Sequence, residues 1–312
     1  MTRTAVVLFG HGTVENLDDL PPFVTNIRRG HPPPPELLAE LRHRYEVIGG
    51  RSPYNDIARR LASRVGDALG VPAAVAMRLW HPFAKDVLRV LAKERDIERA
   101  IFVPLAQHSG DVYGEAARKA AQDLAGEGIV VSVAPTGNWG QTPELLDAFA
   151  ANVRAALLEL PEPLRARTTT LFTAHSLPKA IIDAGDRYEA EFRASVAGVV
   201  ARLAGTGLQE SVAFQSQGPA VGAGGRPVAW LGPDLPAALD AVAARGHTHV
   251  LFAPIGFLAD HVEILYDLDV EAKGLAAARG LTMSRARSLN DDEALVAVIA
   301  ALARPLVNAS DP

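Results

Sequence analysis

The chain has 312 residues, more than one typical domain, so two domains or a duplicated domain are expected. Hydrophobic residues make up 48% of it and the net charge is −5 without a basic run, which fits a soluble globular protein and gives no sign of a nucleic-acid partner. Because the chain has no cysteine, disulfides, thiolate zinc sites, a catalytic cysteine and cysteine-held iron–sulfur clusters are excluded.

No segment of the sequence predicts secretion or membrane insertion. The apolar run near the start, residues 5–9, is too short for the core of a signal peptide. The longest apolar run, residues 294–303, is far shorter than a bilayer span and is typical of a terminal core helix. We therefore expect a cytoplasmic protein with no stable membrane insertion.

Short apolar runs alternate with helical patterns along the chain. The runs are typical of buried strands, and we place them at residues 5–9, 73–79, 100–105, 169–174 and 250–253. Between the first two, an apolar stripe at Ile57, Leu61, Val65 and Leu69 indicates a helix. This alternation predicts an α/β fold with parallel sheets and right-handed crossovers.

The second half of the sequence repeats the scheme of the first. Residues 5–13, AVVLFGHGT, resemble residues 170–178, TLFTAHSLP, and residues 102–113, FVPLAQHSGDVY, resemble residues 253–266, APIGFLADHVEILY. We predict two βαβ domains related by duplication, residues 1–145 and 146–312, with the boundary near residues 142–163.

Five histidines follow expected strands or open the next helix, where open α/β sheets bind their ligands. A single histidine in such a place is more often a packing or capping residue, but several at equivalent sheet ends favour a site. The five are His11, His81, His108, His175 and His261. The other four, His31, His43, His247 and His249, have polar surroundings and are expected at the surface.

A row of acids follows the last expected strand. Glu263, Asp267 and Glu271 are spaced by four residues, which places them on one helical face, with His261 near its start. A solvated acidic face is the alternative interpretation. The position directly after a strand and the nearby imidazole favour the handling of a divalent cation.

Other site types lack their motifs. Gly10-His11-Gly12 has no third glycine of a dinucleotide fingerprint, and no phosphate-binding loop occurs. The nucleophile elbow of α/β-hydrolases and the H-E-x-x-H zinc motif are also absent.

Several motifs, in order, resemble the signature of the ferrochelatases. They are Ala174-His175-Ser176-Leu177-Pro178, Gly185-Asp186-Arg187-Tyr188, Phe214-Gln215-Ser216-Gln217, Trp230-Leu231-Gly232-Pro233 and residues 254–267. The N-terminal third, with Ile27-Arg28-Arg29-Gly30 and residues 44–53, looks most like the soluble Gram-positive-type branch, the coproporphyrin III ferrochelatases. A glycine-rich insertion at residues 218–226 is expected to be a surface loop.

The resemblance implies two Rossmann-like, chelatase-type domains around a porphyrin cleft. It also implies insertion of Fe(II) into coproporphyrin III in haem biosynthesis, by a monomer with iron as a substrate and no tightly bound cofactor. By the same resemblance His175 and Glu263 are catalytic and face each other at the metal-insertion site, and Asp267 and Glu271 continue the metal path on a helix with a π-type stretch. The positions that match the porphyrin-binding set are His11, Thr13, Arg28, Arg29, Arg44, Tyr45 and Ser52.

His11 departs from the branch, which has tyrosine at this position. In the branch that tyrosine can ligate the product iron, so His11 is a candidate axial ligand. A Gly-His-Gly turn also resembles the cobalt chelatases of the corrinoid pathway, which leaves the metal preference open. Two more functions stay open, namely insertion of iron into protoporphyrin IX and porphyrin carriage without turnover. The paired His175 and Glu263 argue against the carrier.

Overall fold

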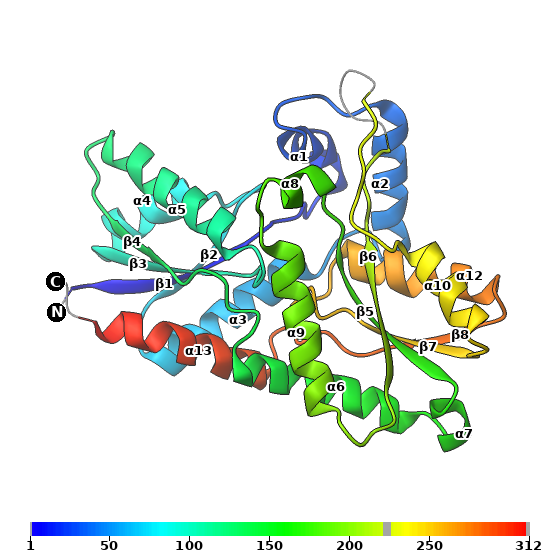
Figure 1. Ribbon diagram of the computed structural model, residues 1–312. Coiled ribbons are helices and arrows are strands. Elements are labelled where there is room, and N and C mark those ends of the chain that lie inside the picture. Colours follow the sequence, from blue (N-terminus) through cyan, green and yellow to red (C-terminus); the bar gives the residue numbers. More distant parts are fainter. Residues whose placement is uncertain (1, 221–225, 310–312) are drawn as a thin grey trace. The chain divides into compact units, whose positions relative to one another are not determined.

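The computed structural model describes residues 2–220 and 226–309, so residues 221–225 of the glycine-rich insertion lie outside the described part. The chain forms two compact units (Figure 1). Unit 1 comprises residues 1–139 and 290–312, and unit 2 comprises residues 140–289. No helix in the described part of the chain is both long and apolar enough to span a bilayer.

Unit 1 contains a parallel four-stranded sheet. Its strands are β1 (Thr4–Gly10), β2 (Ala73–Met77), β3 (Arg99–Pro104) and β4 (Ser132–Pro135), in the spatial order β2-β1-β3-β4. The central strand β1 is buried along its whole length and pairs with β2 and β3 on either side. Its unbroken apolar sequence is that of a strand covered on both faces.

The helices of unit 1 are η1 (Leu17–Asp19), α1 (Leu20–Ile27), α2 (Pro35–Val47), α3 (Tyr54–Leu69), α4 (Ala84–Arg95), α5 (Gly110–Ala125) and α13 (Glu293–Asn308). On one face of the sheet, α4 and α5 enclose a core that includes Phe9 and Phe102. The helices α3 and α13 pack together and contact β1, so the unit has three layers (Figure 1).

Unit 2 repeats this sheet. Its strands are β5 (Thr168–His175), β6 (Gln209–Gln215), β7 (His249–Ala253) and β8 (Thr282–Arg285), all parallel and in the order β6-β5-β7-β8. The order is that of unit 1 with four added to each strand number. The predicted pair of parallel sheets flanked by helices is therefore confirmed, and the matching orders support the duplication.

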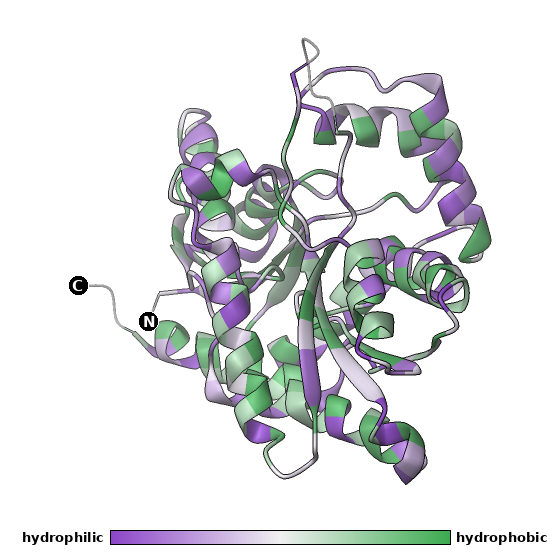
Figure 2. Ribbon diagram, turned by 45° about the vertical axis from the view of Figure 1, so that its right-hand side comes forward, coloured by the Kyte–Doolittle hydropathy of each residue, from purple (hydrophilic) through white to green (hydrophobic). Residues whose placement is uncertain are grey.

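The helices of unit 2 are α6 (Pro143–Glu159), α7 (Glu162–Arg165), α8 (Lys179–Asp183), α9 (Tyr188–Arg202), α10 (Leu235–Ala244), α11 (Val262–Leu265), the π-helix η3 (Asp267–Ala272) and α12 (Lys273–Ala277). One face of the sheet packs on α10, α11, η3 and α12. The helices α6 and α9 pack together, and α6 also contacts β7. The helices carry green apolar and purple polar residues side by side (Figure 2), as expected where one face is buried.

The two units exchange their last helices. The helix α6 follows the sheet of unit 1 but belongs to unit 2, and α13 follows the sheet of unit 2 but belongs to unit 1. The units thus differ from the expected domains 1–145 and 146–312, because residues 290–312 join the N-terminal unit. The apolar face of α13, with Leu295 and Ile299 fully buried, explains why this segment is part of that core.

Candidate active site

His175 is the last residue of β5, so the sheet fixes its backbone. Its Nδ1 lies 2.5 Å from the carbonyl oxygen of Ser176. A carbonyl can only accept a hydrogen bond, so Nδ1 carries the proton and, in the neutral imidazole, Nε2 holds the lone pair. Nε2 lies 3.6 Å from Oε1 of Glu263, and both side chains are about one-third exposed, at 34% and 32%. The structure thus brings together the two residues predicted to be catalytic.

Tyr188, the first residue of α9, helps to hold the backbone of His175 in place. Its hydroxyl donates to the backbone carbonyl of His175 at 3.0 Å. Burial, and secondarily the charge of Glu263, raises the pKa of Tyr188 above its ordinary value. The phenol therefore remains protonated and keeps its role as a donor.

Glu263 lies in the first turn of α11, and two neighbours hold its backbone. Its N–H donates to Nδ1 of His261, which caps the helix, at 3.2 Å. Its carbonyl accepts from Nε2 of Gln215 at 2.6 Å. His261 is therefore in a structural position, although the strand-end pattern first suggests a site residue.

The predicted acid row continues into a π-helix. The carbonyl of Tyr266 accepts from the N–H groups of Val270 and Glu271, at 3.1 and 2.9 Å, which marks the change to the wider turn. Asp267 is 2% exposed and accepts from Oγ of Ser216 at 2.5 Å. Glu271 is exposed. The row thus runs from a half-buried acid through a buried one to the surface.

These acids form a series, not one metal centre. In residues 2–220 and 226–309, no group of three or more His, Asp or Glu side chains is placed to hold a metal ion together. Separate carboxylates suit an ion that must move, because a closed ligand set would retain it.

Arg285, at the end of β8, was not expected from the sequence. Its Nε and Nη2 donate to the two carboxylate oxygens of Asp269 in the π-helix, at 2.7 and 2.9 Å. Its Nη1 lies 3.3 Å from Oδ1 of Asp260, which also accepts from Ser288 at 2.7 Å. Neither aspartate shares the spacing of the acid row, so periodicity could not find this network.

In unit 1, His11 lies directly after β1, as His175 ends β5. Its Nδ1 donates to the carbonyl of Gly12 at 3.1 Å, and the residue is exposed. Its ring meets that of Phe23 edge to face at 6.4 Å between centroids, and Phe23 meets Trp80 at 5.8 Å. The surroundings of His11 are therefore aromatic.

Three residues of the predicted porphyrin-binding set are buried inside unit 1. Thr13 and Tyr45 are 4% and 2% exposed and hydrogen-bond to each other through their hydroxyls at 2.6 Å. Ser52 is 2% exposed, and its Oγ accepts from the N–H of Tyr54 at the start of α3. In this conformation these side chains shape the unit instead of presenting hydroxyls at its surface.

The three arginines of the set belong to the α1 and α2 region. Arg29 is exposed, with a left-handed φ of 55° two residues after the end of α1. Arg28 donates to the carbonyl of His31 at 3.3 Å, and Arg44 pairs with Glu40 at 2.5 Å. Each can offer a planar fork of donors to a carboxylate.

The remaining strand-end histidines differ in surroundings. His108 is 3% exposed, and burial lowers its pKa to about 3, so it is a neutral core residue and not part of an open site. The ring of His81 meets Trp80 edge to face at 5.2 Å between centroids and lies tilted against Phe83 at 4.5 Å. The expectation that His249 lies at the surface is wrong. It is 3% exposed and bonds the hydroxyls of Thr282 and Ser284 on the neighbouring strand, at 2.7 and 2.9 Å.

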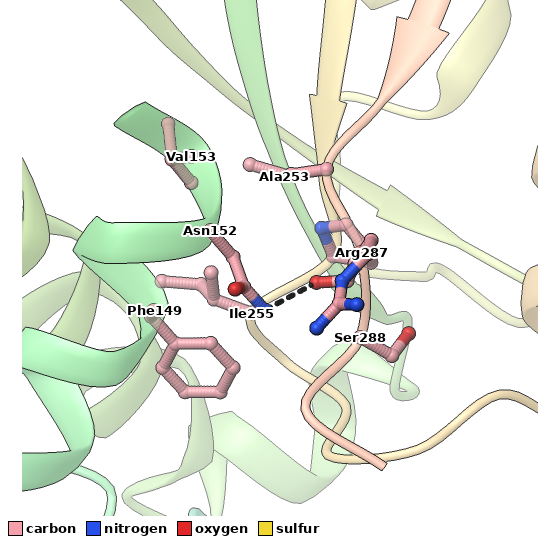
Figure 3. Close-up of a pocket in the computed structure, with 9 residues that line it drawn as sticks. Phe149, Asn152, Val153, Ala253, Ile255, Arg287 and Ser288 are labelled. Carbon is pink, nitrogen blue, oxygen red and sulfur yellow. Dashed lines mark hydrogen bonds between the residues drawn. The ribbon is translucent and has the colours of Figure 1, made fainter. Parts of the chain in front are cut away.

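A small pocket in unit 2 is a packing feature (Figure 3). It is lined by residues of α6 and by the segments that follow β7 and β8, among them Phe149 and Ile255. Nδ2 of Asn152 donates to the carbonyl of Arg287 across it at 3.0 Å. Its cavity volume of about 10 Å³ holds one water molecule at most, far below ordinary ligand sites, and none of the predicted site residues lines it.

The fold is that of the chelatases. SirB from Bacillus subtilis, solved with Fe³⁺, matches 99% of this chain and 96% of its own with a TM-score of 0.59 and 11% identity. CbiX, described as the terminal enzyme for biosynthesis of siroheme in denitrifying bacteria, matches 98% of this chain and 100% of its own with a TM-score of 0.54 and 15% identity. At these identities the likeness concerns the fold alone.

Residues 3–306 match the ferrochelatase family, and the chain belongs to that family. It is an enzyme, a metallochelatase of the lyase class, and the family acts on a porphyrin and ferrous iron. A ferrochelatase of Herpetosiphon aurantiacus is 33% identical over 94% of this chain and 96% of its own. The coproporphyrin III ferrochelatases of Geobacillus kaustophilus and Bacillus subtilis are 32% and 30% identical, over 95% and 87% of this chain and 94% and 87% of their own.

Proposed function

We propose that the protein inserts Fe(II) into coproporphyrin III to give Fe-coproporphyrin in haem biosynthesis. The observation that carries the proposal is Nε2 of His175 facing Glu263 at 3.6 Å, on motifs of the ferrochelatase family. Relatives named coproporphyrin III ferrochelatase, at 32% and 30% identity, support the choice of porphyrin.

His175 is the proton acceptor in this proposal. Metal insertion releases two pyrrole N–H protons for each Fe(II) that enters, so a base must stand at the macrocycle. The neutral imidazole has its Nδ1 proton held by the Ser176 carbonyl, which leaves Nε2 to accept. Glu263, adjacent to Nε2, takes the proton onward or holds the incoming cation.

The acid row serves the passage of the metal or of protons. Glu271 is exposed and meets the hydrated ion, Asp267 is the buried intermediate, and Glu263 delivers the ion to the porphyrin. Carboxylates bind Fe(II) through exchangeable oxygen ligands, which suits transfer. Iron is a substrate here, and the proposal needs no tightly bound cofactor.

The carboxylates of the porphyrin are the proposed partners of Arg28, Arg29 and Arg44. Coproporphyrin carries four carboxylates and dissolves in water, which suits a cytoplasmic monomer without stable membrane insertion. Thr13, Tyr45 and Ser52 are buried, so we propose that they shape the porphyrin site from within unit 1.

A metal-insertion assay tests the proposal most directly. Fe(II), Co(II) and Zn(II) are each offered with coproporphyrin III and with protoporphyrin IX. We expect the largest kcat/KM for Fe(II) with coproporphyrin III. Preference for protoporphyrin IX would replace the substrate, preference for Co(II) would replace the metal, and porphyrin binding without turnover would make the protein a carrier.

We further propose His11 as an axial ligand of the product iron. An imidazole is a stronger ligand for haem iron than the tyrosine of the related branch. The absorption spectrum of the Fe(II) product complex and the electron paramagnetic resonance spectrum of its oxidised Fe(III) form are compared between the wild type and His11→Ala. A change of axial-ligand signature is expected, and identical spectra would refute the role.

A further inference from the structure

We infer that Arg285 is a positioning residue that fixes the part of the acid row formed by Glu263 and Asp267, and the inference rests on the proposed function. Its guanidinium binds Asp260, three residues before Glu263, and Asp269, two residues after Asp267. One side chain on β8 therefore closes the segment 260–269, which contains the two acids nearest the porphyrin.

The geometry distinguishes this contact from an ordinary surface ion pair. The side chain of Arg285 is 15% exposed, and its two aspartates are 21% and 36% exposed. Three of its nitrogens donate, two of them in a fork to Asp269. Lysine would keep the charge but could not supply the fork. Without the guanidinium, Asp260 and Asp269 would lose their shared counter-charge in a partly buried place.

The π-helix explains why such a fixture is needed. A π turn is rare because the α-helix is more stable. It is found mostly as a local feature at functional sites. Asp269 lies within the π-helix, and Arg285 ties it to the sheet edge. If the turn relaxed to α geometry, later residues would rotate by about 100° for each residue removed from the turn. The side chains of Asp267 and Glu271 would then take new directions relative to Glu263.

The test compares Arg285 with a matched arginine. Arg279 is 20% exposed and pairs with Asp240 on α10, away from the acid row. We expect Arg285→Lys and Arg285→Gln to lower kcat/KM for Fe(II) at least tenfold, with the dissociation constant for coproporphyrin III changed less than twofold. Arg279→Lys and Arg279→Gln are expected to stay within twofold in both. Equal iron kinetics for the Arg285 and Arg279 variants would overturn the inference, as would full activity of Arg285→Lys.

Two further measurements separate positioning from mere loss of stability. In a double-mutant cycle, Asp269→Asn should cost little more once Arg285→Gln is present, because both remove the same contact. Hydrogen exchange of the Val270 and Glu271 amides should speed up at least tenfold in Arg285→Gln, whether or not any metal is inserted. Additive losses, or unchanged exchange, would contradict the inference. If the wild type inserts no iron while Arg285→Gln still shows this faster exchange, the proposed function alone is refuted.

Discussion

The two units share one frame and differ in what is packed against it. Both have the same strand order, and in both a histidine follows or ends the central strand, His11 after β1 and His175 in β5. In both, the helix that leads to the next strand begins with a tyrosine, Tyr54 or Tyr188, hydrogen-bonded to the backbone of that histidine. The frame thus places an imidazole in each unit.

The difference lies in the neighbour of the imidazole. In unit 2 the helix after β7 presents Glu263 to His175 at 3.6 Å. In unit 1 the corresponding helix, after β3, begins at Gly110, where a Cβ atom would lie 2.1 Å from the backbone of Gly137, so this position has no room for a side chain. His11 faces the ring of Phe23 instead. The comparison teaches that the fold provides the same position in both units, while the elements packed on it decide whether the imidazole faces a carboxylate or an aromatic ring.

The largest expected effect is the loss of the stable fold of unit 1 when α13 is deleted. Deleting residues 290–312 removes α13, in which Leu295, Val298 and Ile299 are buried. Burial of such side chains contributes about 1.5–3 kcal/mol each, so the loss is comparable to the stability of a whole domain. Unit 1 should therefore lose its cooperative unfolding transition. Trp80 and Trp139 fluorescence, in a Trp230→Phe background, reports on that unit, and an unchanged urea midpoint would contradict the assignment of α13.

The next largest effect is expected when the proposed catalytic side chains are removed and the fold is kept. His175→Ala and Glu263→Gln should each lower kcat by about 100-fold or more, the range of general acid–base catalysis, while coproporphyrin III still binds. His31→Ala, on an exposed histidine of unit 1, is the control and should leave kcat unchanged. Stopped-flow absorbance follows insertion. Near-normal turnover of both site variants would remove them from the mechanism.

A smaller effect concerns the acid stability of unit 1. Burial lowers the pKa of His108 from 6.5 to about 3, so between these values the unfolded chain binds a proton that the folded one does not. The stability linked to the neutral His108 is fully present above pH 6.5. As the pH falls below that value, the free energy of unfolding decreases by at most about 1.4 kcal/mol per pH unit. Urea unfolding at pH 7 and pH 5 should show a loss of about 2 kcal/mol, reduced in His108→Gln. An equal loss in that variant would assign the sensitivity to other groups.

The smallest effect distinguishes the two tyrosines. Tyr54→Phe and Tyr188→Phe should each lower the free energy of unfolding by about 1 kcal/mol, because a buried backbone partner loses its hydrogen bond. Only Tyr188→Phe should also lower kcat, by several-fold, since its hydroxyl holds the strand end that carries His175. Chemical denaturation and steady-state kinetics measure the two quantities. Equal kinetics for both variants would show that the support of His175 is not needed for turnover.

Much of the fold was predictable because its signals are local. Buried strands such as β1 and β7 are continuous apolar runs, and the acid row has a helical period. The edge strands β4, β8 and β6 were missed, since SVAP, TMSR and QESVAFQ are short or polar at their exposed ends. The packing of α13 on unit 1 was also missed, because the apolar face of a helix does not indicate which sheet it packs against.

The site was predictable where motifs carry it and not where tertiary contacts do. His175 and Glu263 stand in motifs, and the structure places them together. Arg285 was invisible, because the sequence does not show that β8 lies beside the π-helix. His249 was misplaced for a related reason: its partners Thr282 and Ser284 are more than thirty residues away, on the paired strand.

The exchange of α6 and α13 has a consequence for the order of synthesis. On the ribosome the sheet of unit 1 is made before unit 2, yet α13, which covers one of its faces together with α3, is made after unit 2. All elements of unit 2 lie in residues 140–289, so they emerge before that helix does. The central strand β1 thus has one apolar face incompletely covered until α13 has been translated, and unit 1, begun before unit 2, is completed after it. In the cell, this nascent sheet is where a chaperone would be needed.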